Sequence, residues 1–171
     1  MVYYVPYEQG PIRPPSEAYS LLIRVTRGCP WNRCEFCGIY EEEKFTIRTV
    51  EEIEADIYNA AAFHRQRGVV FETAFLQDAN SIIMKTSDLI EVITCIKEQF
   101  PSIQRITSYG RSHTVARKSV EALKALSAAG LSRIHIGLET GCDELLSYMK
   151  KGTTAQEHIT AGRKVKESGI S

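Results

Sequence analysis

Short apolar runs alternate with longer amphipathic stretches along most of this chain. The apolar runs favour β-strands, because they are rich in β-branched and aromatic residues and are bounded by turn-forming residues. The amphipathic stretches repeat apolar side chains at the spacing of a helix face. We therefore predict four strands and four helices, with the strands at residues 21–25, 69–76, 103–110 and 133–139 and the helices at residues 49–68, 86–100, 119–130 and 154–169.

The helix at residues 49–68 has the clearest boundaries. Thr49 is followed three residues later by Glu52, which is the pattern of a capping box. Apolar residues then form one stripe, and Gly68 ends the helix. Proline or glycine also follows each of the other helices, which is consistent with their expected ends.

The strand–helix alternation occurs four times and predicts the α/β class with a parallel sheet. Four βα units do not close an eight-stranded barrel, so we expect an incomplete (βα)n TIM-like barrel. Residues 1–18 carry four of the six prolines and predict an irregular N-terminal arm. Residues 19–171 form the expected core domain. The sequence stops where another strand should begin, so we expect this domain to be truncated before its fifth strand.

The composition excludes several classes of protein. The chain has 171 residues, 43% of them apolar and 25% charged, with a formal net charge of zero. These values are ordinary for a globular protein and do not indicate nucleic-acid or membrane binding. The sequence contains neither an apolar run long enough to cross a membrane nor a secretory signal, so we expect a cytoplasmic protein.

Three of the five cysteines lie close together. Cys29, Cys34 and Cys37 fall within nine residues, whereas Cys95 and Cys142 stand apart and are interpreted as packing or capping residues. In a reducing compartment such a cluster indicates metal binding rather than disulfides. Thiolates bind zinc, copper(I) and iron–sulfur clusters. Structural zinc uses four protein ligands, whereas three thiolates directly after a strand could hold a [4Fe–4S] cluster with one open iron. A structural zinc site and a non-catalytic iron–sulfur domain for electron transfer or sensing remain alternatives.

Two segments give the chain a resemblance to a known family. The first is RGCPWNRCEFC at residues 27–37, with Phe36 directly before the last cysteine, and the second is GLSRIHIGLETGCDELLSYMKKGTT at residues 130–154. Together with the order of strands and helices, they resemble the radical S-adenosylmethionine (radical SAM) enzymes over residues 20–169. The second segment looks like the branch that includes tRNA methylthiotransferases and oxygen-independent coproporphyrinogen oxidases. The family spaces its cysteines by three and then two residues, whereas this chain has four and then two. We expect one residue to be looped out between Cys29 and Cys34.

The resemblance implies a partial (βα)6 barrel and a [4Fe–4S] cluster on Cys29, Cys34 and Cys37. It implies that the open iron binds S-adenosylmethionine (SAM). An electron from the cluster would cleave SAM to a 5′-deoxyadenosyl radical, which would abstract hydrogen from an unknown substrate. The electron would come from an external donor of the flavodoxin or ferredoxin type.

The resemblance also implies SAM contacts near the ends of the strands. Carboxylates and amides there could accept from the SAM ammonium or ribose, and a guanidinium could pair with its carboxylate. The candidate SAM-binding residues are Phe36, Asp78, Asn80, Ser108, Arg111 and Glu139. Trp31 is interpreted as a possible cover over the cluster, and His135 as a packing residue within its strand.

Overall fold

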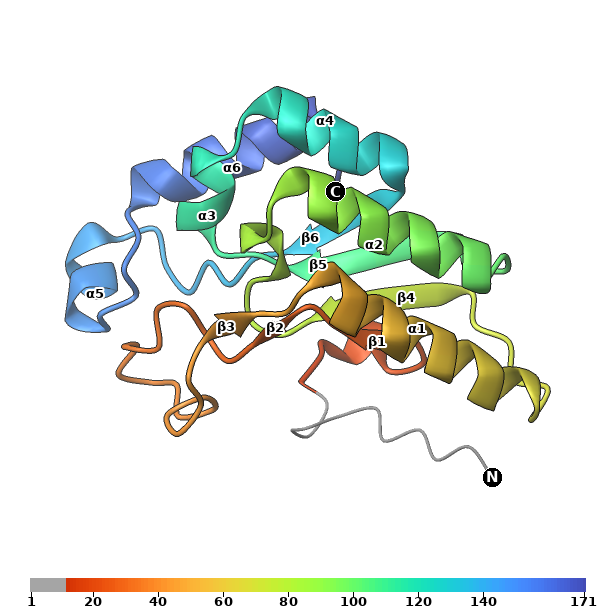
Figure 1. Ribbon diagram of the computed structural model, residues 1–171. Coiled ribbons are helices and arrows are strands. Elements are labelled where there is room, and N and C mark those ends of the chain that lie inside the picture. Colours follow the sequence, from red (N-terminus) through yellow and green to blue (C-terminus); the bar gives the residue numbers. More distant parts are fainter. Residues whose placement is uncertain (1–11) are drawn as a thin grey trace.

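A parallel four-stranded sheet forms the centre of the molecule in the computed structural model, which describes residues 12–171. The strands occur in the order β1-β4-β5-β6, and every neighbouring pair is parallel (Figure 1). Their bounds are β1 Leu21–Arg24, β4 Thr73–Gln77, β5 Arg105–Tyr109 and β6 Leu131–His135. The strands confirm the predicted α/β class and parallel sheet.

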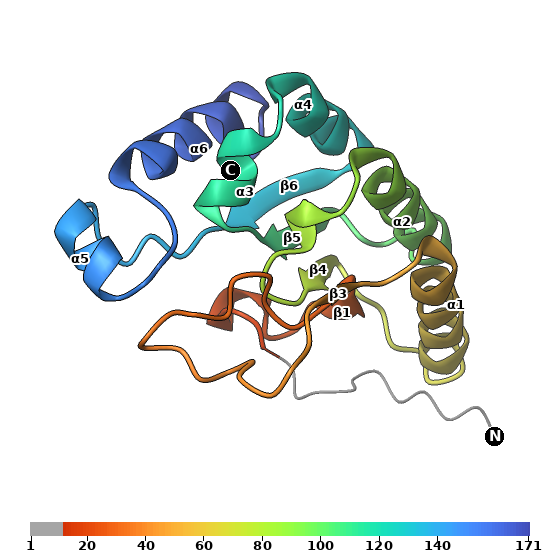
Figure 2. The same ribbon diagram turned by 60° about the vertical axis from the view of Figure 1, so that its left-hand side comes forward.

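Four longer helices cover one side of the curved sheet. They are α1 Val50–Arg65, α2 Thr86–Gln99, α4 Val120–Ala129 and α6 Ala155–Glu167. Figure 2 shows them following one another around the outside of the strands, as in part of a barrel wall. Thr49 and Thr154 each begin a helix with a complete capping box, which satisfies amide groups that have no partner within the helix.

Alternation of side chains along the strands divides the sheet into two faces. Ile23, Leu76 and Ile106 belong to the main apolar core, which lies between the sheet and the helices. Leu22 and Phe75 are fully buried but lie outside that core, which places them on the opposite, concave face. On the concave face the rings of Phe75, Tyr109 and His135 contact one another.

Two predicted strand positions were wrong. The strand predicted from residue 69 begins at Thr73, because Val69 and Val70 lie in the preceding loop with 44% and 72% of their surface exposed. The strand predicted at residues 133–139 occupies Leu131–His135 instead. The chain then leaves the sheet and runs toward α5.

Several short elements were not predicted, because a few residues cannot display a helical or strand period. They are the helices α3 Ser112–Arg117 and α5 Asp143–Tyr148, the 3₁₀ turns η1 Pro15–Glu17 and η2 Ser81–Ile83, and the strands β2 Thr26–Arg27 and β3 Thr46–Ile47. β2 and β3 pair in an antiparallel ladder and bracket the loop that carries the clustered cysteines.

The predicted irregular arm is partly ordered. Residues 1–11 lie outside the described part of the chain, but η1 packs under the sheet and buries Glu17 completely. Glu17 accepts hydrogen bonds from Ser20 Oγ at 2.5 Å and from His135 Nε2 at 3.3 Å, and it pairs with Arg105 at 3.5 Å. These contacts place η1 on the concave face, because His135 belongs to that face.

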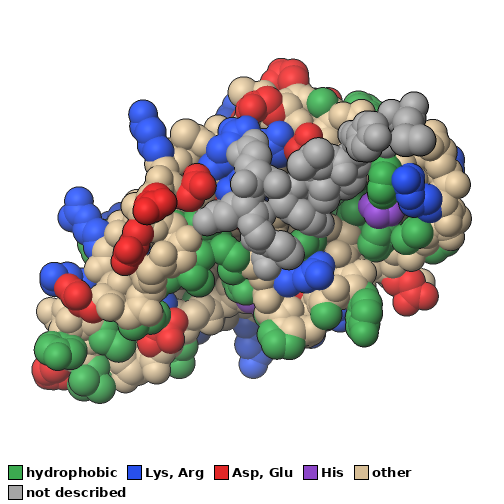
Figure 3. Space-filling model, turned by 90° about the horizontal axis from the view of Figure 1, so that it is seen from below, with side chains coloured by type: hydrophobic (Ala, Val, Ile, Leu, Met, Phe, Trp, Pro, Cys, Tyr) green, Lys and Arg blue, Asp and Glu red, His purple; other side chains and the backbone are tan. Residues whose placement is uncertain are grey.

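The distribution of charged side chains and the polarity of the helices describe the surface of the molecule. Acidic and basic side chains are interspersed over the face seen from below in Figure 3, as expected for a chain with no net charge. Within residues 12–171, no helix is both long and apolar enough to span a membrane.

Candidate metal and cofactor site

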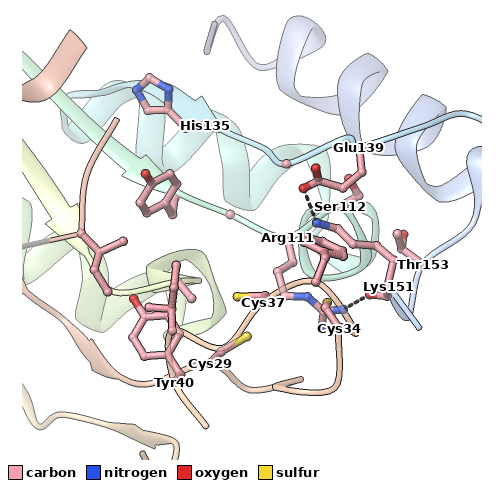
Figure 4. A pocket seen from close by; sticks show the side chains of 17 residues that line it. Cys29, Cys34, Cys37, Tyr40, Arg111, Ser112, His135, Glu139, Lys151 and Thr153 are labelled. Carbon is pink, nitrogen blue, oxygen red and sulfur yellow. Dashed lines mark hydrogen bonds and ion pairs between the residues drawn. The ribbon is translucent and has the colours of Figure 1, made fainter. Parts of the chain in front are cut away.

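A cavity of about 300 Å³ opens at the carboxyl ends of the strands. This is the edge at which parallel α/β folds gather their functional groups. Figure 4 shows side chains from the cysteine loop, from the segments after β5 and β6, and from the segment after α5 turned toward one space. The lining residues are Ile12, Cys29, Cys34, Phe36, Cys37, Ile39, Tyr40, Ala79, Tyr109, Gly110, Arg111, Ser112, His135, Gly137, Glu139, Lys151 and Thr153.

The three clustered cysteines line this cavity together. Their thiols are free and partly exposed, and all three belong to the loop between β2 and β3. Cys37 N–H donates to the carbonyl of Cys34 at 3.1 Å, which forms a turn at the end of the motif. At the start of the loop, Gly28 has a positive φ of 71° and donates its N–H to Asp78 Oδ2 at 3.1 Å. The loop is thereby fastened to the end of β4.

A local change of backbone direction lies within the long gap of the cysteine motif. Asn32 adopts a positive φ of 47°, a conformation that asparagine tolerates better than most residues. Its side-chain amide donates to the carbonyl of Tyr40 at 2.6 Å, which holds the two sides of the loop together. The backbone therefore turns at Asn32, and the looping-out of one residue between Cys29 and Cys34 stays a prediction.

Two cationic side chains face the cysteines across the cavity. Burial raises the pKa of the Cys34 thiol, and the positive charges of Lys151 and Arg111 act in the opposite direction. Burial lowers the pKa of Arg111, while Cys29 and Cys34 in their charged forms would raise it. Lys151 and Arg111 therefore favour the thiolate form of Cys34, but the effect of burial is larger and the pKa is raised overall.

In the described part of the chain, the three thiols are not arranged as the ligands of one metal ion. Among residues 12–171, no three cysteine, histidine or acidic side chains stand close enough to bind one ion together. In a [4Fe–4S] cluster each cysteine binds a different iron, so the thiolates lie farther apart than around one zinc ion. Three thiols on one loop, facing a shared cavity beside two cations, are consistent with such a cluster.

Three of the predicted SAM-binding residues also line the cavity. Glu139 pairs with Lys151 Nζ at 2.7 Å, and the same ammonium lies 5.3 Å from the centre of the Phe36 ring. Arg111 Nη2 donates to the backbone carbonyls of Lys151 at 2.9 Å and Gly152 at 3.3 Å. Phe36, Arg111 and Glu139 thus form one connected group around Lys151.

The other three predicted residues do not line the cavity, and their side chains are buried beneath it. Asp78 is 3% exposed and accepts from Arg24 Nε and Nη2 at 3.1 and 2.8 Å. Burial raises the pKa of the Asp78 carboxyl, against the opposing effect of the Arg24 guanidinium. This side chain meets a buried cation of the chain itself, whereas the sequence interpretation assigned it to the SAM ammonium.

Asn80 and Ser108 have similar internal partners. Asn80 is fully buried; it donates to Thr114 Oγ1 at 2.7 Å and accepts from the Arg111 N–H at 3.0 Å. Ser108, also fully buried, donates to the carbonyl of Tyr109 at 2.9 Å or of Leu76 at 3.3 Å. Asn80 follows β4 as predicted, whereas Ser108 lies within β5. The direction of both side chains could not be read from the sequence.

Sequence reasoning missed several residues of the cavity, notably Lys151 and Tyr40. Lys151 follows a short unpredicted helix, and Tyr40 lies beyond the cysteine motif, so neither stands at a strand end. His135 lines the cavity as well as packing against neighbouring rings, and its bond to Glu17 joins the N-terminal segment to the cavity. The alternation of side chains along its strand was the only sequence signal for the face of the sheet on which His135 lies.

Trp31 does not line the same cavity as the cysteines. It lies against Gly152 in a second hollow, formed with α5 and the segment that follows it. The two hollows adjoin each other, because Thr153 lines both. The interpretation of Trp31 as a cover over the cluster stays a prediction.

Comparisons with known proteins agree with this geometry. The chain is 29% identical to tRNA-2-methylthio-N(6)-dimethylallyladenosine synthase of Hahella chejuensis over 161 residues, which are 90% of this chain and 34% of that protein. It is 26% identical to an uncharacterized methyltransferase of Pyrococcus horikoshii over 151 residues, or 87% of this chain and 30% of that protein. The chain thus spans about a third of the length of these relatives.

Solved structures share the fold. The cobalamin-dependent S-adenosylmethionine radical enzyme OxsB, with aqua-cobalamin and S-adenosylmethionine bound, gives a TM-score of 0.71 at 21% identity, covering 89% of this chain and 23% of that one. The radical S-adenosylmethionine methyltransferase TsrM from Kitasatospora setae gives 0.64 at 22% identity, covering 90% and 29%. The sequence profile of the Radical SAM superfamily matches residues 23–171, and this chain belongs to that superfamily.

Proposed function

We propose that the chain is the cluster-binding part of a radical SAM enzyme, with a [4Fe–4S] cluster on Cys29, Cys34 and Cys37. The observation that carries the proposal is that these three thiols line one cavity with Arg111 and Lys151. When bound, the cluster would supply one electron and an open iron for reductive cleavage of SAM to a 5′-deoxyadenosyl radical. An external donor of the flavodoxin or ferredoxin type would provide the electron.

We assign the polar groups of the cavity wall to SAM. Lys151 and the Arg111 guanidinium would face the SAM carboxylate, because both carry positive charge at the cavity wall. Glu139 would accept from the SAM ammonium or ribose, in exchange for part of its pairing with Lys151. Phe36 would contribute an apolar surface beside the third cysteine.

Asp78, Asn80 and Ser108 would act indirectly in this proposal. Asp78 holds the start of the cysteine loop through the Gly28 N–H, and Asn80 holds the backbone of Arg111. Ser108 ties the end of β5 to the neighbouring strand through Leu76. These bonds would fix the cavity wall without direct contact to SAM.

The cluster assignment is tested by iron and sulfide analysis after anaerobic reconstitution. We expect Cys34→Ala to lose most of the bound iron, because one of three thiolate ligands is gone. Cys142→Ala is the matched control, since Cys142 is exposed and does not line the cavity. Unchanged iron content in Cys34→Ala would refute the assignment, and zinc without sulfide would support the structural-zinc alternative.

The enzymatic assignment is tested by adding SAM to the reduced, reconstituted protein. A change in the electron paramagnetic resonance spectrum of the cluster is expected, because SAM would bind at the open iron. Formation of 5′-deoxyadenosine under a strong reductant would demonstrate cleavage. A cluster whose spectrum does not respond to SAM would instead favour the non-catalytic iron–sulfur domain.

A further inference from the structure

The long gap of the cysteine motif carries a side chain that reaches across to a distant part of the chain. Trp31 Nε1 donates to the carbonyl of Lys150 at 2.7 Å, although 119 positions separate the two residues. Its ring lies against Gly152, so closely that a Cβ atom at that position would overlap the indole. Gly152 also has a positive φ of 66°, which favours glycine for a second reason.

Further contacts join the same two segments. We call residues 149–152 the 149–152 turn. Glu35 N–H donates to the carbonyl of Met149 at 3.0 Å, and the Glu35 carboxylate pairs with the Lys150 ammonium. The cysteine loop therefore contacts the turn through backbone, ion-pair and aromatic interactions on both sides of Cys34.

Trp31 also contacts the cavity wall directly. The Arg111 guanidinium carbon lies 5.2 Å from the centre of the indole ring, and that of Arg33 lies 5.4 Å away, both within cation–π range. Arg111 in turn donates to the backbone carbonyls of Lys151 and Gly152. One indole thus touches the loop that carries the cysteines, the turn that carries Lys151, and the guanidinium between them.

We propose that Trp31 is a positioning residue that couples the cysteine loop to the SAM-facing wall formed by Arg111 and Lys151. The four-residue gap would serve this role: Asn32 turns the chain at positive φ, the cysteines line the cavity, and Trp31 lines the adjoining hollow. Occupancy of the cysteines and occupancy of the cationic wall then stabilise each other. This coupling rests on the proposed function, whereas the docking of Trp31 does not.

Docking is tested on the protein without a cluster. Trp31 is the single tryptophan of the chain, so its fluorescence reports on this contact alone. We expect Gly152→Ala to shift the emission to longer wavelength and to increase quenching by acrylamide several-fold, because the added methyl group displaces the indole. Gly68→Ala is the matched control: Gly68 has a φ of 64°, but a Cβ atom there meets nothing within 4 Å. Unchanged emission in a folded Gly152→Ala protein would overturn the docking.

Coupling is tested on the reconstituted protein by the rate of iron release to a ferrous-iron chelator, with and without SAM. We expect SAM to slow release from the wild type and from Gly68→Ala. In Trp31→Ala we expect the cluster to assemble but the slowing by SAM to be lost. A merely structural tryptophan would change the rate without changing its response to SAM.

The possible failures are distinguishable. If the wild type binds no cluster or its release rate ignores SAM, the proposed function and the coupling both fail, and the fluorescence of the apoprotein still decides the docking. If the wild type responds to SAM and Trp31→Ala responds equally, only the coupling fails.

Discussion

The two groups of polar residues at the carboxyl edge of the sheet have different surroundings. Arg24 at the end of β1 and the residues Asp78 and Asn80 after β4 are at most 4% exposed. Arg24 and Asp78 pair with each other, and Asn80 bonds to Thr114 and to the backbone of Arg111. Residues farther along the chain, such as Lys151 and Glu139, are partly exposed and pair across a cavity. The first group, which we call the framework, fixes the backbone, whereas the second, the cavity wall, keeps groups available for a ligand.

The largest expected effect comes from breaking the framework pair of Arg24 and Asp78. Asp78→Ala removes the buried carboxylate that pairs with the Arg24 guanidinium, whose side chain is 3% exposed. We expect the free energy of unfolding to fall by about 3–5 kcal/mol, as for other broken buried pairs. Chemical denaturation of the apoprotein measures it.

A surface pair provides the control for that experiment. Lys85 pairs with Asp88 at 3.7 Å, and its side chain is 77% exposed. Lys85→Ala should change stability by less than about 1 kcal/mol, because exposed pairs contribute little. Equal losses in Asp78→Ala and Lys85→Ala would contradict the division into framework and cavity wall.

Lys151 and Lys150 test whether the cavity wall binds SAM, because Lys151 lines the cavity whereas Lys150 is exposed and pairs with Glu35. Lys151→Ala should weaken SAM binding to the reconstituted protein by about tenfold or more, since it removes a charged hydrogen-bonding group from the cavity. Lys150→Ala removes an exposed partner of Glu35 and should leave the affinity within about twofold. Equilibrium dialysis with labelled SAM compares them, and equal affinities would place SAM elsewhere.

Asn80 tests directly whether the framework and the cavity wall have different roles. Asn80→Ala leaves the Arg111 N–H and the Thr114 hydroxyl without this partner and should cost about 1–3 kcal/mol of stability. Its effect on SAM affinity should be much smaller than that of Lys151→Ala. A loss of affinity as large as for Lys151→Ala, at unchanged stability, would return Asn80 to the list of direct SAM contacts.

The smallest expected effect is a loss of stability at mildly acidic pH. Burial lowers the pKa of His158, which hydrogen-bonds through Nδ1 to Ser112 of the cavity at 2.5 Å. Lys151 also lowers this pKa, whereas Glu157, Glu139 and Asp143 raise it. The unfolded chain therefore binds the proton more readily, so stability is complete above the ordinary histidine pKa of about 6.5 and is lost as the pH falls below it.

Replacement of His158 separates its contribution from that of His64, whose pKa is also lowered by burial. His158→Gln should reduce the slope of stability against pH between about 7 and 5.5, as measured by thermal unfolding at several pH values. An unchanged slope would assign the acid sensitivity to His64 or to groups outside the cavity wall.

The sequence was sufficient for the class of fold because its long elements carry clear local signals. The capping box at Thr49 and the apolar stripe that follows it both appear in α1. Short elements such as α5 gave no period, and the valines at 69 and 70 looked like a strand although they are exposed. Residue type cannot tell a strand from an apolar loop when the burial comes from tertiary packing.

For the site, the sequence predicted where residues lie along the chain better than it predicted where their side chains point. The cysteine motif was found, and all three thiols line one cavity. Asp78 follows a strand as predicted, yet its carboxylate turns inward and accepts from Arg24, 54 positions away in sequence. Lys151 was missed because it follows a six-residue helix rather than a strand. Contacts between residues so far apart in sequence leave no pattern in the neighbouring residues from which they could be predicted.

The N-terminal segment that ends in η1, with Glu17 buried, has a consequence for the range of molecules that can enter the cavity. Ile12 lines the cavity, and Glu17 holds His135 on the concave face of the sheet. Part of the floor is therefore built from a segment that contributes no strand to the sheet. Exchanges in this segment could alter the depth and polarity of the chamber while the strands and the cysteine loop stay as they are. Under the proposed function, selectivity could thus evolve separately from the residues that would hold the cluster.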